Sequence, residues 1–182
     1  MEFIKQSLHD VWLIQPKVFY DERGYFMESF RYDQFEKHVG QINFIQDNES
    51  KSTQGVLRGL HYQTGEYSQA KLVRVLQGAV LDVIVDLRKS SPTFGQHLAI
   101  ELSEENKTQL FVPRGFAHGF KVISETAVFA YKVDNIYSKE HEATLLWNDS
   151  SLDIHWNINE SEIILSEKDK VGKPFSETPL FE

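Results

Sequence analysis

The stretch "KLVRVLQGAVLDVIVDL" (71–87) decides the fold class of this 182-residue chain. It contains two runs rich in Val, Leu and Ile, which are separated by Gln77-Gly78. Glycine accepts the positive φ that tight turns require, so this pattern predicts a β-hairpin. In the second run apolar residues occupy every second position of 81–87, whereas Asp82 and Asp86 fall on the opposite face. A period of two is typical of a half-buried strand.

The rest of the chain continues the β pattern. We expect further strands, separated by turn sequences, at 96–102, 109–113 and 127–137. Short strands at this spacing are typical of a sandwich or barrel, not of alternating βαβ units. The best helix candidate is "RYDQFEKHVG" (31–40), in which Phe35 and Val39 are four residues apart and Gly40 can cap the end. No repeat or linker interrupts the pattern, so we expect one mainly β domain over 1–182 with a few short helices.

Composition narrows the class of protein. The net charge is −8, from 19 basic and 27 acidic residues, which argues against a general nucleic-acid or membrane-surface binder. The chain has no cysteine, which excludes disulfides, thiolate nucleophiles and Cys-ligated metals. The N-terminal residues lack the apolar core of a signal peptide, and no apolar run is long enough to span a bilayer. We therefore expect a cytoplasmic protein.

The segment "GVLRGLHYQ" (55–63) places a cation and a titratable ring inside a strand-like run. Strict alternation would point Arg58 and His61 to opposite faces. A bulge at Gly59 could re-aim the neighbouring side chains, or Arg58 could serve a site in another subunit. Because its planar fork donates two parallel hydrogen bonds, arginine at such a position suits a diphosphate.

Two of the seven histidines, His61 and His118, lie beside glycines in otherwise apolar segments. Each alone is better interpreted as a hydrogen-bonded core residue. As a pair, each near a cation and an aromatic residue, they favour a functional role. The other five lie in contexts typical of surface or turn positions and are given no role: His9, His38, His97, His141 and His155.

The segment "VPRGFAHGF" (112–120) has the form Pro-x-Gly-x-x-His, which resembles the second motif of the cupin superfamily of jelly-roll barrels. In metal-binding cupins an earlier strand supplies two closely spaced histidines and a carboxylate. Here the corresponding region offers His61 alone, and Lys71 would bring positive charge to the place of a cation. A catalytic metal usually needs three protein ligands, so we predict no metal.

Several polar residues allow two interpretations. Tyr131 can fill the core of a barrel, or it can serve as a proton donor whose phenol finds a polar partner. Asp169 is by default an exposed turn residue, and it can orient an imidazole only if the C-terminal segment folds back over the barrel. Arg23 and Lys168 alone would be surface charges, whereas Lys71 adjoins apolar strand residues and is harder to dismiss.

Taken together, these segments resemble the dTDP-4-dehydrorhamnose 3,5-epimerase family, metal-free enzymes of the cupin class. The resemblance covers nearly the whole chain, from "DERGYFMESF" (21–30) through "GVLRGLHYQ" and "VPRGFAHGF" to "LSEKD" (165–169). It implies a cupin-type jelly-roll barrel, a homodimer and no cofactor. The implied reaction inverts C3 and C5 of dTDP-4-dehydro-6-deoxy-D-glucose and gives dTDP-4-dehydro-L-rhamnose.

The resemblance also implies roles for individual residues. His61 is the general base, Asp169 fixes its tautomer, Tyr131 is the acid on the opposite face of the sugar, and Lys71 stabilises the enolate oxygen. The residues implied to hold phosphate or sugar oxygens are Arg23, Arg58, Lys168 and, nearby, His118. The residues implied to contact the nucleotide or complete its pocket are Glu28, Gln46, Asp47, Asn48, Tyr137 (stacked on thymine) and Glu142.

These roles make chemical sense, because inverting a carbon beside a ketone needs a base on one face, an acid on the other and a stabilised oxyanion. A neutral imidazole is a good base at neutral pH, and a phenol with a pKa of about 10 stays protonated. Three alternatives remain: an epimerase of one carbon or a ketoisomerase on the same sugar, a metal-dependent cupin enzyme, and a non-catalytic sugar-nucleotide-binding barrel.

Overall fold

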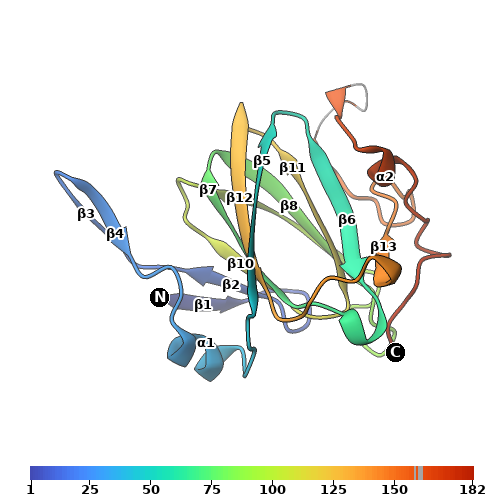
Figure 1. Ribbon diagram of the computed structural model, residues 1–182, viewed down its shortest axis with the longest axis horizontal. Helices are drawn as coiled ribbons and strands as arrows, with labels where there is room; N and C mark the ends of the chain where they lie inside the picture. Colours follow the sequence, from blue (N-terminus) through green and yellow to red (C-terminus); the bar gives the residue numbers. More distant parts are fainter. Residues whose placement is uncertain (158, 160–161) are drawn as a thin grey trace.

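The computed structural model describes residues 1–157, 159 and 162–182, and within them two antiparallel sheets face each other (Figure 1). In spatial order the first sheet consists of β1 (Glu2–Lys5), β2 (Trp12–Gln15), β10 (Gln109–Val112), β7 (Lys71–Gln77), β12 (Thr126–Val133) and β5 (Gln46–Thr53). The second consists of β13 (Glu142–Thr144), β6 (Leu57–Gln63), β11 (Phe116–Val122), β8 (Ala79–Asp86) and β9 (His97–Ser103). This arrangement confirms the predicted mainly β, cupin-type jelly-roll class.

The remaining elements are short. A separate hairpin of β3 (Val18–Asp21) and β4 (Gly24–Met27) projects from the body of the molecule (Figure 1). The helical elements are α1 (Tyr32–His38), η1 (Gly65–Tyr67), η2 (Lys139–His141) and α2 (Glu167–Lys170). Across the described ranges no helix is long and apolar enough to cross a membrane.

The run 71–87 forms two strands as predicted, but the predicted hairpin is wrong. β7 pairs with β10 and β12 in the first sheet, whereas β8 pairs with β11 and β9 in the second. Gly78, with φ of 75°, is the corner at which the chain crosses between sheets. A side chain there would lie 2.0 Å from the Thr126 carbonyl oxygen. A glycine turn marks a change of direction equally well in both arrangements, so the local pattern could not separate them.

β8 is also more deeply buried than the alternation of apolar and charged residues predicted. The face of Val83 and Val85 packs under the C-terminal segment, and the opposite face, with Ile84, lies in the core between the sheets. Consequently Asp82 and Asp86 are fully buried, not exposed on the second face of a half-buried strand. The covering layer comes from residues far along the chain, and for that reason alternation within the strand did not reveal it.

The other predicted elements agree in position and differ in length. β9, β10 and α1 occupy the predicted ranges to within a few residues. Gly40 follows the C-cap residue Val39 with φ of 120°, and its N–H donates to the Glu36 carbonyl at 3.1 Å. The strand expected over 127–137 ends at Val133. The residues after Val133 leave the sheet and form a loop at the edge of the pocket described below.

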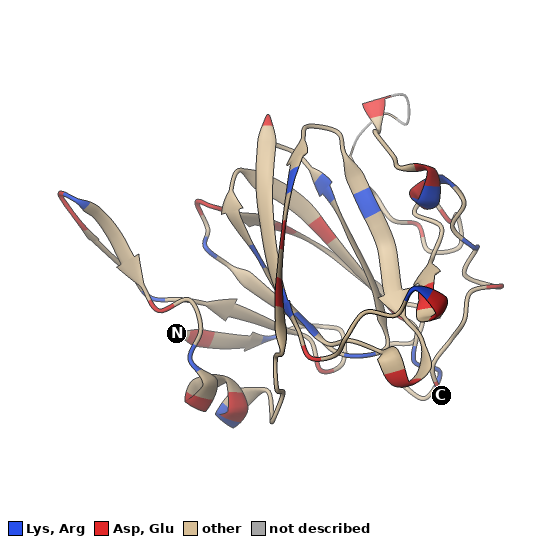
Figure 2. Ribbon diagram, viewed as in Figure 1, with Lys and Arg blue, Asp and Glu red and all other residues tan. Residues whose placement is uncertain are grey.

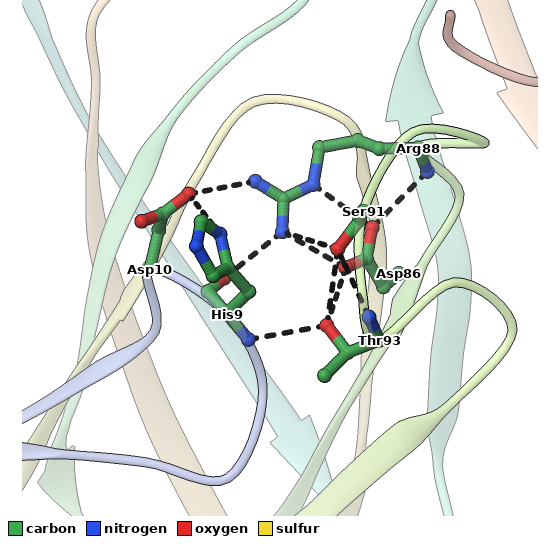
Figure 3. A network of polar contacts seen from close by, with 6 residues as sticks. All are labelled: His9, Asp10, Asp86, Arg88, Ser91 and Thr93. Carbon is green, nitrogen blue, oxygen red and sulfur yellow. Dashed lines mark hydrogen bonds and ion pairs between the residues drawn. The ribbon is translucent and has the colours of Figure 1, made fainter.

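The buried carboxylate of Asp86 organises the loop after β8 (Figure 3). It accepts hydrogen bonds from Arg88 Nε at 2.9 Å, Ser91 Oγ at 2.6 Å and Thr93 Oγ1 at 2.8 Å. Arg88 also donates to Asp10 at 3.0 Å, which ties the N-terminal loop to the same cluster. Burial acts to raise the pKa of Asp86, but these donors outweigh it and the pKa is lowered. The ionised group therefore joins two loops that are distant in sequence.

A bulge in β6 answers the question raised by Arg58 and His61. On β11 His118 pairs with His61 and Phe120 with Arg58, so β6 holds one residue more than β11 between these pairs. The bulge contains Gly59, which has φ of 138°. It places Arg58 and His61 on the same side of the strand, as the first of the two alternatives predicted.

The bulge depends on close approach of two backbones at Gly119. A Cβ atom there would lie 2.6 Å from the Arg58 carbonyl oxygen and 2.9 Å from Gly59 Cα. We expect Gly119→Ala to lower the free energy of unfolding by about 1–3 kcal/mol, because neither backbone can yield without breaking strand pairing. Urea denaturation of the variant and the parent chain measures the difference.

Gly65→Ala is the matched control. Gly65 has φ of 59°, and its added Cβ would meet no atom closer than His141 Cδ2 at 4.0 Å. Its cost is the backbone term alone, roughly 1 kcal/mol. If Gly119→Ala loses no more stability than this control, the close approach does not constrain the bulge.

Candidate active site

A cavity of about 270 Å³ opens between the two sheets. Its walls are formed by β5, β6, β7, β11 and β12, and part of its rim is formed by the loop after β12. The predicted site residues that line it are Arg58, His61, Lys71, His118, Tyr131, Tyr137 and Glu142. Thus one chain brings together the histidines, cations and phenol that the sequence singled out.

His61 forms a short polar contact with Asp169. Its Nε2 lies 2.5 Å from Asp169 Oδ1, and the two side chains are 29% and 3% exposed. Asp169 is held in turn by Ser166 Oγ, which donates to Oδ2 at 2.6 Å, and by the Gly59 N–H at 3.3 Å. The carboxylate is therefore fixed from three directions, and the imidazole is aimed by it.

The charge state of this pair follows from its surroundings. Burial acts to raise the pKa of Asp169, but the hydrogen bonds from His61 and Ser166 outweigh it and lower the pKa below its usual value. Asp169 is therefore an ionised acceptor, and Nε2 of His61 carries the donated proton. In the neutral ring this leaves the lone pair on Nδ1, where it can accept a proton.

The C-terminal segment folds back and carries Asp169 to the barrel. Ile164 forms a parallel bridge with Val56, and Lys173 forms another with Leu145, on either side of α2. In Figure 1 this segment runs along the outside of β6 and β13. The default interpretation of Asp169 as an exposed turn residue is wrong, since the residue is only 2% exposed.

Lys71, at the start of β7, contributes positive charge to the same pocket. Its Nζ lies 3.4 Å from the His61 carbonyl oxygen. Desolvation lowers the pKa of Lys71 to about 8, while the carboxylate of Asp82 acts in the opposite direction. The ammonium therefore remains mainly protonated at neutral pH, and a negative oxygen bound next to it would be stabilised.

His118 lines the pocket and contacts Asp82, a buried carboxylate with no role predicted from the sequence. Its Nε2 is 2.9 Å and 3.1 Å from the two oxygens of Asp82, which is fully buried. Burial lowers the pKa of His118, and Asp82 opposes that effect. The sequence did contain one indication of this buried carboxylate: Asp82 lies between the apolar residues Val80 and Ile84 on the inner face of β8.

Tyr131 faces His61 from the other sheet. Tyr131 belongs to β12 of the first sheet and His61 to β6 of the second, and both line the pocket. Burial raises the pKa of Tyr131, and the charge of Arg58 opposes the rise. The phenol therefore stays protonated at neutral pH and can donate a proton. Arg58 is itself oriented by Ser52, whose Oγ accepts from Nε at 3.0 Å.

Three polar residues meet at the rim of the pocket. The Tyr137 hydroxyl donates to Glu142 Oε2 at 3.2 Å, and Lys168 forms an ion pair with the other oxygen of Glu142. Tyr137 is 54% exposed, so much of its aromatic side chain is accessible to solvent. An exposed aromatic ring between charged groups is suited to a nucleobase with an attached phosphate.

The β5 residues of the predicted site lie beside the pocket, not in it. Asp47 and Asn48 line a neighbouring hollow of about 330 Å³, which shares Glu49 and Tyr131 with the pocket. Gln46 donates to the Asn48 side chain at 2.8 Å. A ligand that extended from the pocket past Tyr131 would reach these groups.

Arg23 and Glu28 are not brought to the pocket within one chain. Arg23 lies in the turn of the projecting β3–β4 hairpin, where its side chain is 84% exposed and paired with Asp21 at 2.5 Å. Glu28 follows the hairpin and lies 3.7 Å from Arg31. Figure 1 shows the hairpin pointing away from the two sheets.

The pocket contains charges of both signs. Figure 2 shows basic and acidic residues interspersed over the loops and strands of the molecule. In the pocket lining, the cations Arg58 and Lys71 lie with two histidines and the carboxylates Glu49 and Glu142. Among the described residues no group of three His, Cys, Asp or Glu side chains gathers as a metal site would require. The pocket therefore places two imidazoles and a phenol beside two cationic side chains.

The fold and the pocket together define a cupin-type jelly-roll protein with an acid–base site. The family model described as dTDP-4-dehydrorhamnose 3,5-epimerase matches residues 5–177. A protein of that name from Shigella flexneri is 53% identical over 182 residues, which is 100% of this chain and 99% of the relative. This chain therefore belongs to the dTDP-4-dehydrorhamnose 3,5-epimerase family, and the resemblance predicted from the sequence is confirmed.

Solved structures agree with this assignment. The dTDP-4-dehydrorhamnose 3,5-epimerase from Elizabethkingia anophelis NUHP1 is 55% identical, with a TM-score of 0.93 over 97% of each chain. The dTDP-6-deoxy-D-glucose-3,5-epimerase from Legionella pneumophila Philadelphia 1 was solved in complex with dTDP-4-keto-L-rhamnose. It is 44% identical, with a TM-score of 0.94 over 100% of this chain and 98% of the other.

The Asp82 carboxylate should support the positive charge of Lys71. We expect Asp82→Asn to move the Lys71 pKa below about 8, because a neutral amide no longer stabilises the ammonium. The measurement is a pH titration of lysine ¹³Cε chemical shifts by NMR, with the Lys71 signal assigned through Lys71→Arg.

Asp153→Asn removes an exposed carboxylate and serves as the control, since the Asp153 side chain is 83% exposed. It should leave the Lys71 titration unchanged. An unaltered Lys71 pKa in Asp82→Asn would show that the two groups are electrostatically independent.

Proposed function

We propose that this protein epimerises dTDP-4-dehydro-6-deoxy-D-glucose at C3 and C5, giving dTDP-4-dehydro-L-rhamnose in dTDP-L-rhamnose biosynthesis. The observation that carries the proposal is that His61 and Tyr131 enter one pocket from facing sheets. Family membership supports the substrate, and the names of the relatives give the same two carbons.

The first step is removal of a proton by His61. The hydrogens on C3 and C5 are acidic because each carbon adjoins the C4 ketone. Nδ1 of the neutral ring accepts the proton, and the ionised Asp169 stabilises the imidazolium that forms. This general-base role needs only the imidazole and its carboxylate, so no cofactor enters the proposed reaction.

The electron pair of the broken C–H bond moves toward the carbonyl, and negative charge develops on the ketone oxygen. Lys71 supplies the positive charge that stabilises this enolate oxygen. His118, which is held by its hydrogen bond to Asp82, lines the same pocket. C3 and C5 flank the same carbonyl, so one stabilising group serves both inversions. A single pocket of this size is therefore sufficient for two successive epimerisations.

Return of a proton to the opposite face completes each inversion. Tyr131 is suited to this role because its burial keeps the phenol protonated. Its location on the sheet that faces His61 supports donation from the other side of the sugar ring. The same residue supports epimerisation at two carbons over the alternative of a single-carbon epimerase or ketoisomerase, in which a missing or displaced acid would change the outcome.

The remaining predicted contacts fit a nucleoside diphosphate. We assign Arg58 and Lys168 to phosphate oxygens, Tyr137 to stacking on thymine, and Glu142 to the rim of the pocket. Gln46, Asp47 and Asn48 would meet the nucleotide where it passes Tyr131. A diphosphate carries charge that does not cross a bilayer unaided, which supports a cytoplasmic location.

Arg23 and Glu28 acquire a role if two chains associate. The hairpin that carries Arg23 exposes four large aromatic residues: Phe19, Tyr20, Tyr25 and Phe26. Such a patch is typical of an interaction surface. We infer a homodimer in which each hairpin lies over the partner and delivers Arg23 to the partner's pocket. A twofold axis makes this exchange mutual.

Turnover in D₂O tests the reaction itself. We expect deuterium at both C3 and C5 of the product, because each inversion takes its new proton from a solvent-exchanged acid. His61→Asn should lower kcat by about 10²–10⁴-fold, the usual contribution of a general base. Tyr131→Phe should still exchange substrate hydrogens while forming less product. Mass spectrometry and NMR of the sugar measure both quantities.

His155→Asn is the matched control, since its side chain is 79% exposed and outside the pocket. It should turn over like the parent chain. Deuterium at one carbon alone would identify a single-carbon epimerase, and deuterium at neither would overturn the proposal.

Mixed dimers test the exchange of Arg23. His61→Asn and Arg23→Ala proteins should each be nearly inactive at low substrate concentration. After the two are mixed and allowed to exchange subunits, about a quarter of the sites should recover, because each heterodimer holds one site with both native residues. Initial rates before and after exchange give this fraction.

The control mixes His61→Asn with Asp169→Asn, two changes within one pocket of the same chain. No site in that heterodimer is complete, so activity should stay absent. If the Arg23→Ala mixture also fails to recover, Arg23 does not act across an interface.

A further inference from the structure

The exposed ring of Tyr137 is placed by the loop that carries it. The hydrogen bond from its hydroxyl to Glu142, at 3.2 Å, holds one end of the ring, and the residue is 54% exposed. The height of the ring above the pocket therefore depends on the backbone of residues 135–141, here called the rim loop. This loop begins after β12 and ends at η2.

His141 fastens the end of the rim loop in three ways. Its Nδ1 lies 2.9 Å from Ser138 Oγ, next in the chain to Tyr137. Its ring packs against that of Tyr67 in a tilted arrangement, with centroids 4.3 Å apart and planes inclined by 33°. Its carbonyl oxygen accepts from the Thr64 N–H at 2.8 Å. The side chain thus joins the loop both to itself and to the segment that follows β6.

The same segment holds the loop at two other points. The buried amide of Gln63 accepts from the Ser138 N–H at 2.9 Å. Near the start of the loop, Asn135 donates to the Glu66 carbonyl at 2.7 Å, and Gln69 donates to the Asn135 carbonyl at 2.8 Å. Tyr137 lies between these attachments, and Gln63 and Gln69 both line the pocket.

We propose that His141 is a positioning residue that sets the ring of Tyr137 for recognition of the nucleobase, and that it takes no part in the proton transfers. The inference rests on the proposed function, because it assumes that a nucleotide occupies the rim. His141 does not line the pocket, so its effect must pass through the loop. Loss of its contacts should therefore weaken nucleotide binding while the rate of chemistry in the bound complex is kept.

The contacts of His141 can be removed separately. His141→Asn keeps a polar atom near the position of Nδ1 and loses the ring that packs against Tyr67. His141→Phe keeps the ring and loses the bond to Ser138. His141→Ala loses both, and Ser138→Ala removes the hydrogen bond from the other side. The series reports how much each contact contributes to placing the loop.

The experiment measures Kd for dTDP by calorimetry, and KM and kcat for the dTDP-sugar. We expect His141→Ala to raise Kd and KM about tenfold, within the range that one base–aromatic stack contributes, and to leave kcat within about twofold. His141→Asn and His141→Phe should fall between His141→Ala and the parent. Adding His141→Ala to Tyr137→Ala should change Kd by less than about twofold, because the positioned ring is already absent.

A purely structural His141 would give different results. An equal fall in kcat, or an equal rise in Kd with and without Tyr137, would overturn the inference. If His141→Ala does not fold, as judged by circular dichroism, Ser138→Ala in the two backgrounds makes the same decision. The parent chain separates the two levels: failure of the parent to bind dTDP would reject the proposed function, whereas normal binding by parent and His141→Ala alike would reject only the role of His141.

Discussion

The hydrogen bond between His61 and Asp169 is the interaction on which the pocket depends. It joins a strand near the middle of the chain to a short helix near its end, and 108 residues separate the two partners. Asp169 is almost completely buried, so removing His61 would leave its carboxylate with only the Ser166 and Gly59 donors, at a cost below the roughly 3–5 kcal/mol of a buried charge without any partner. Because the folded-state pKa of Asp169 lies below that of the unfolded chain, the pair stabilises the fold at neutral pH. That stabilisation is lost as the pH falls through the folded-state value.

A second buried carboxylate, Asp82, acts on the charges of two residues in the pocket. Asp82 lies inside the barrel with His118 as its hydrogen-bonded partner and Lys71 within range of its charge. The Asp82 carboxylate opposes the lowering of the pKa that burial causes in both Lys71 and His118. The same arrangement keeps an ammonium available at the place where the proposed reaction develops negative charge. Stability of the core and preparation of the pocket therefore use the same residues.

The sequence was sufficient for the class of fold and for most of the pocket, but not for the pairing of strands. Alternation correctly placed the strands around Gly78, yet it carried no information on which neighbours they hydrogen-bond, so the chain's passage between two sheets was mistaken for a hairpin. Gly59 beside Arg58 and His61 did signal the bulge, because glycine inside a strand is otherwise unfavourable. The burial of Asp169 and Asp82 could not be predicted from their own segments, because segments distant in sequence produce it; the role of Asp169 beside His61 was implied by the family resemblance. Arg23 and Glu28 were named through family resemblance, and a single chain leaves them outside the pocket.

The location of Asp169 near the end of the chain has a consequence for biosynthesis. All strands of both sheets precede Asp169 in the chain, so translation adds the walls of the pocket before the residue that orients the imidazole. Lys168 and Ser166 arrive with it, and so do several of the residues that cover Val83 and Val85. The imidazole therefore gains its carboxylate only when the strap of residues 162–182 lies over the outside of β6.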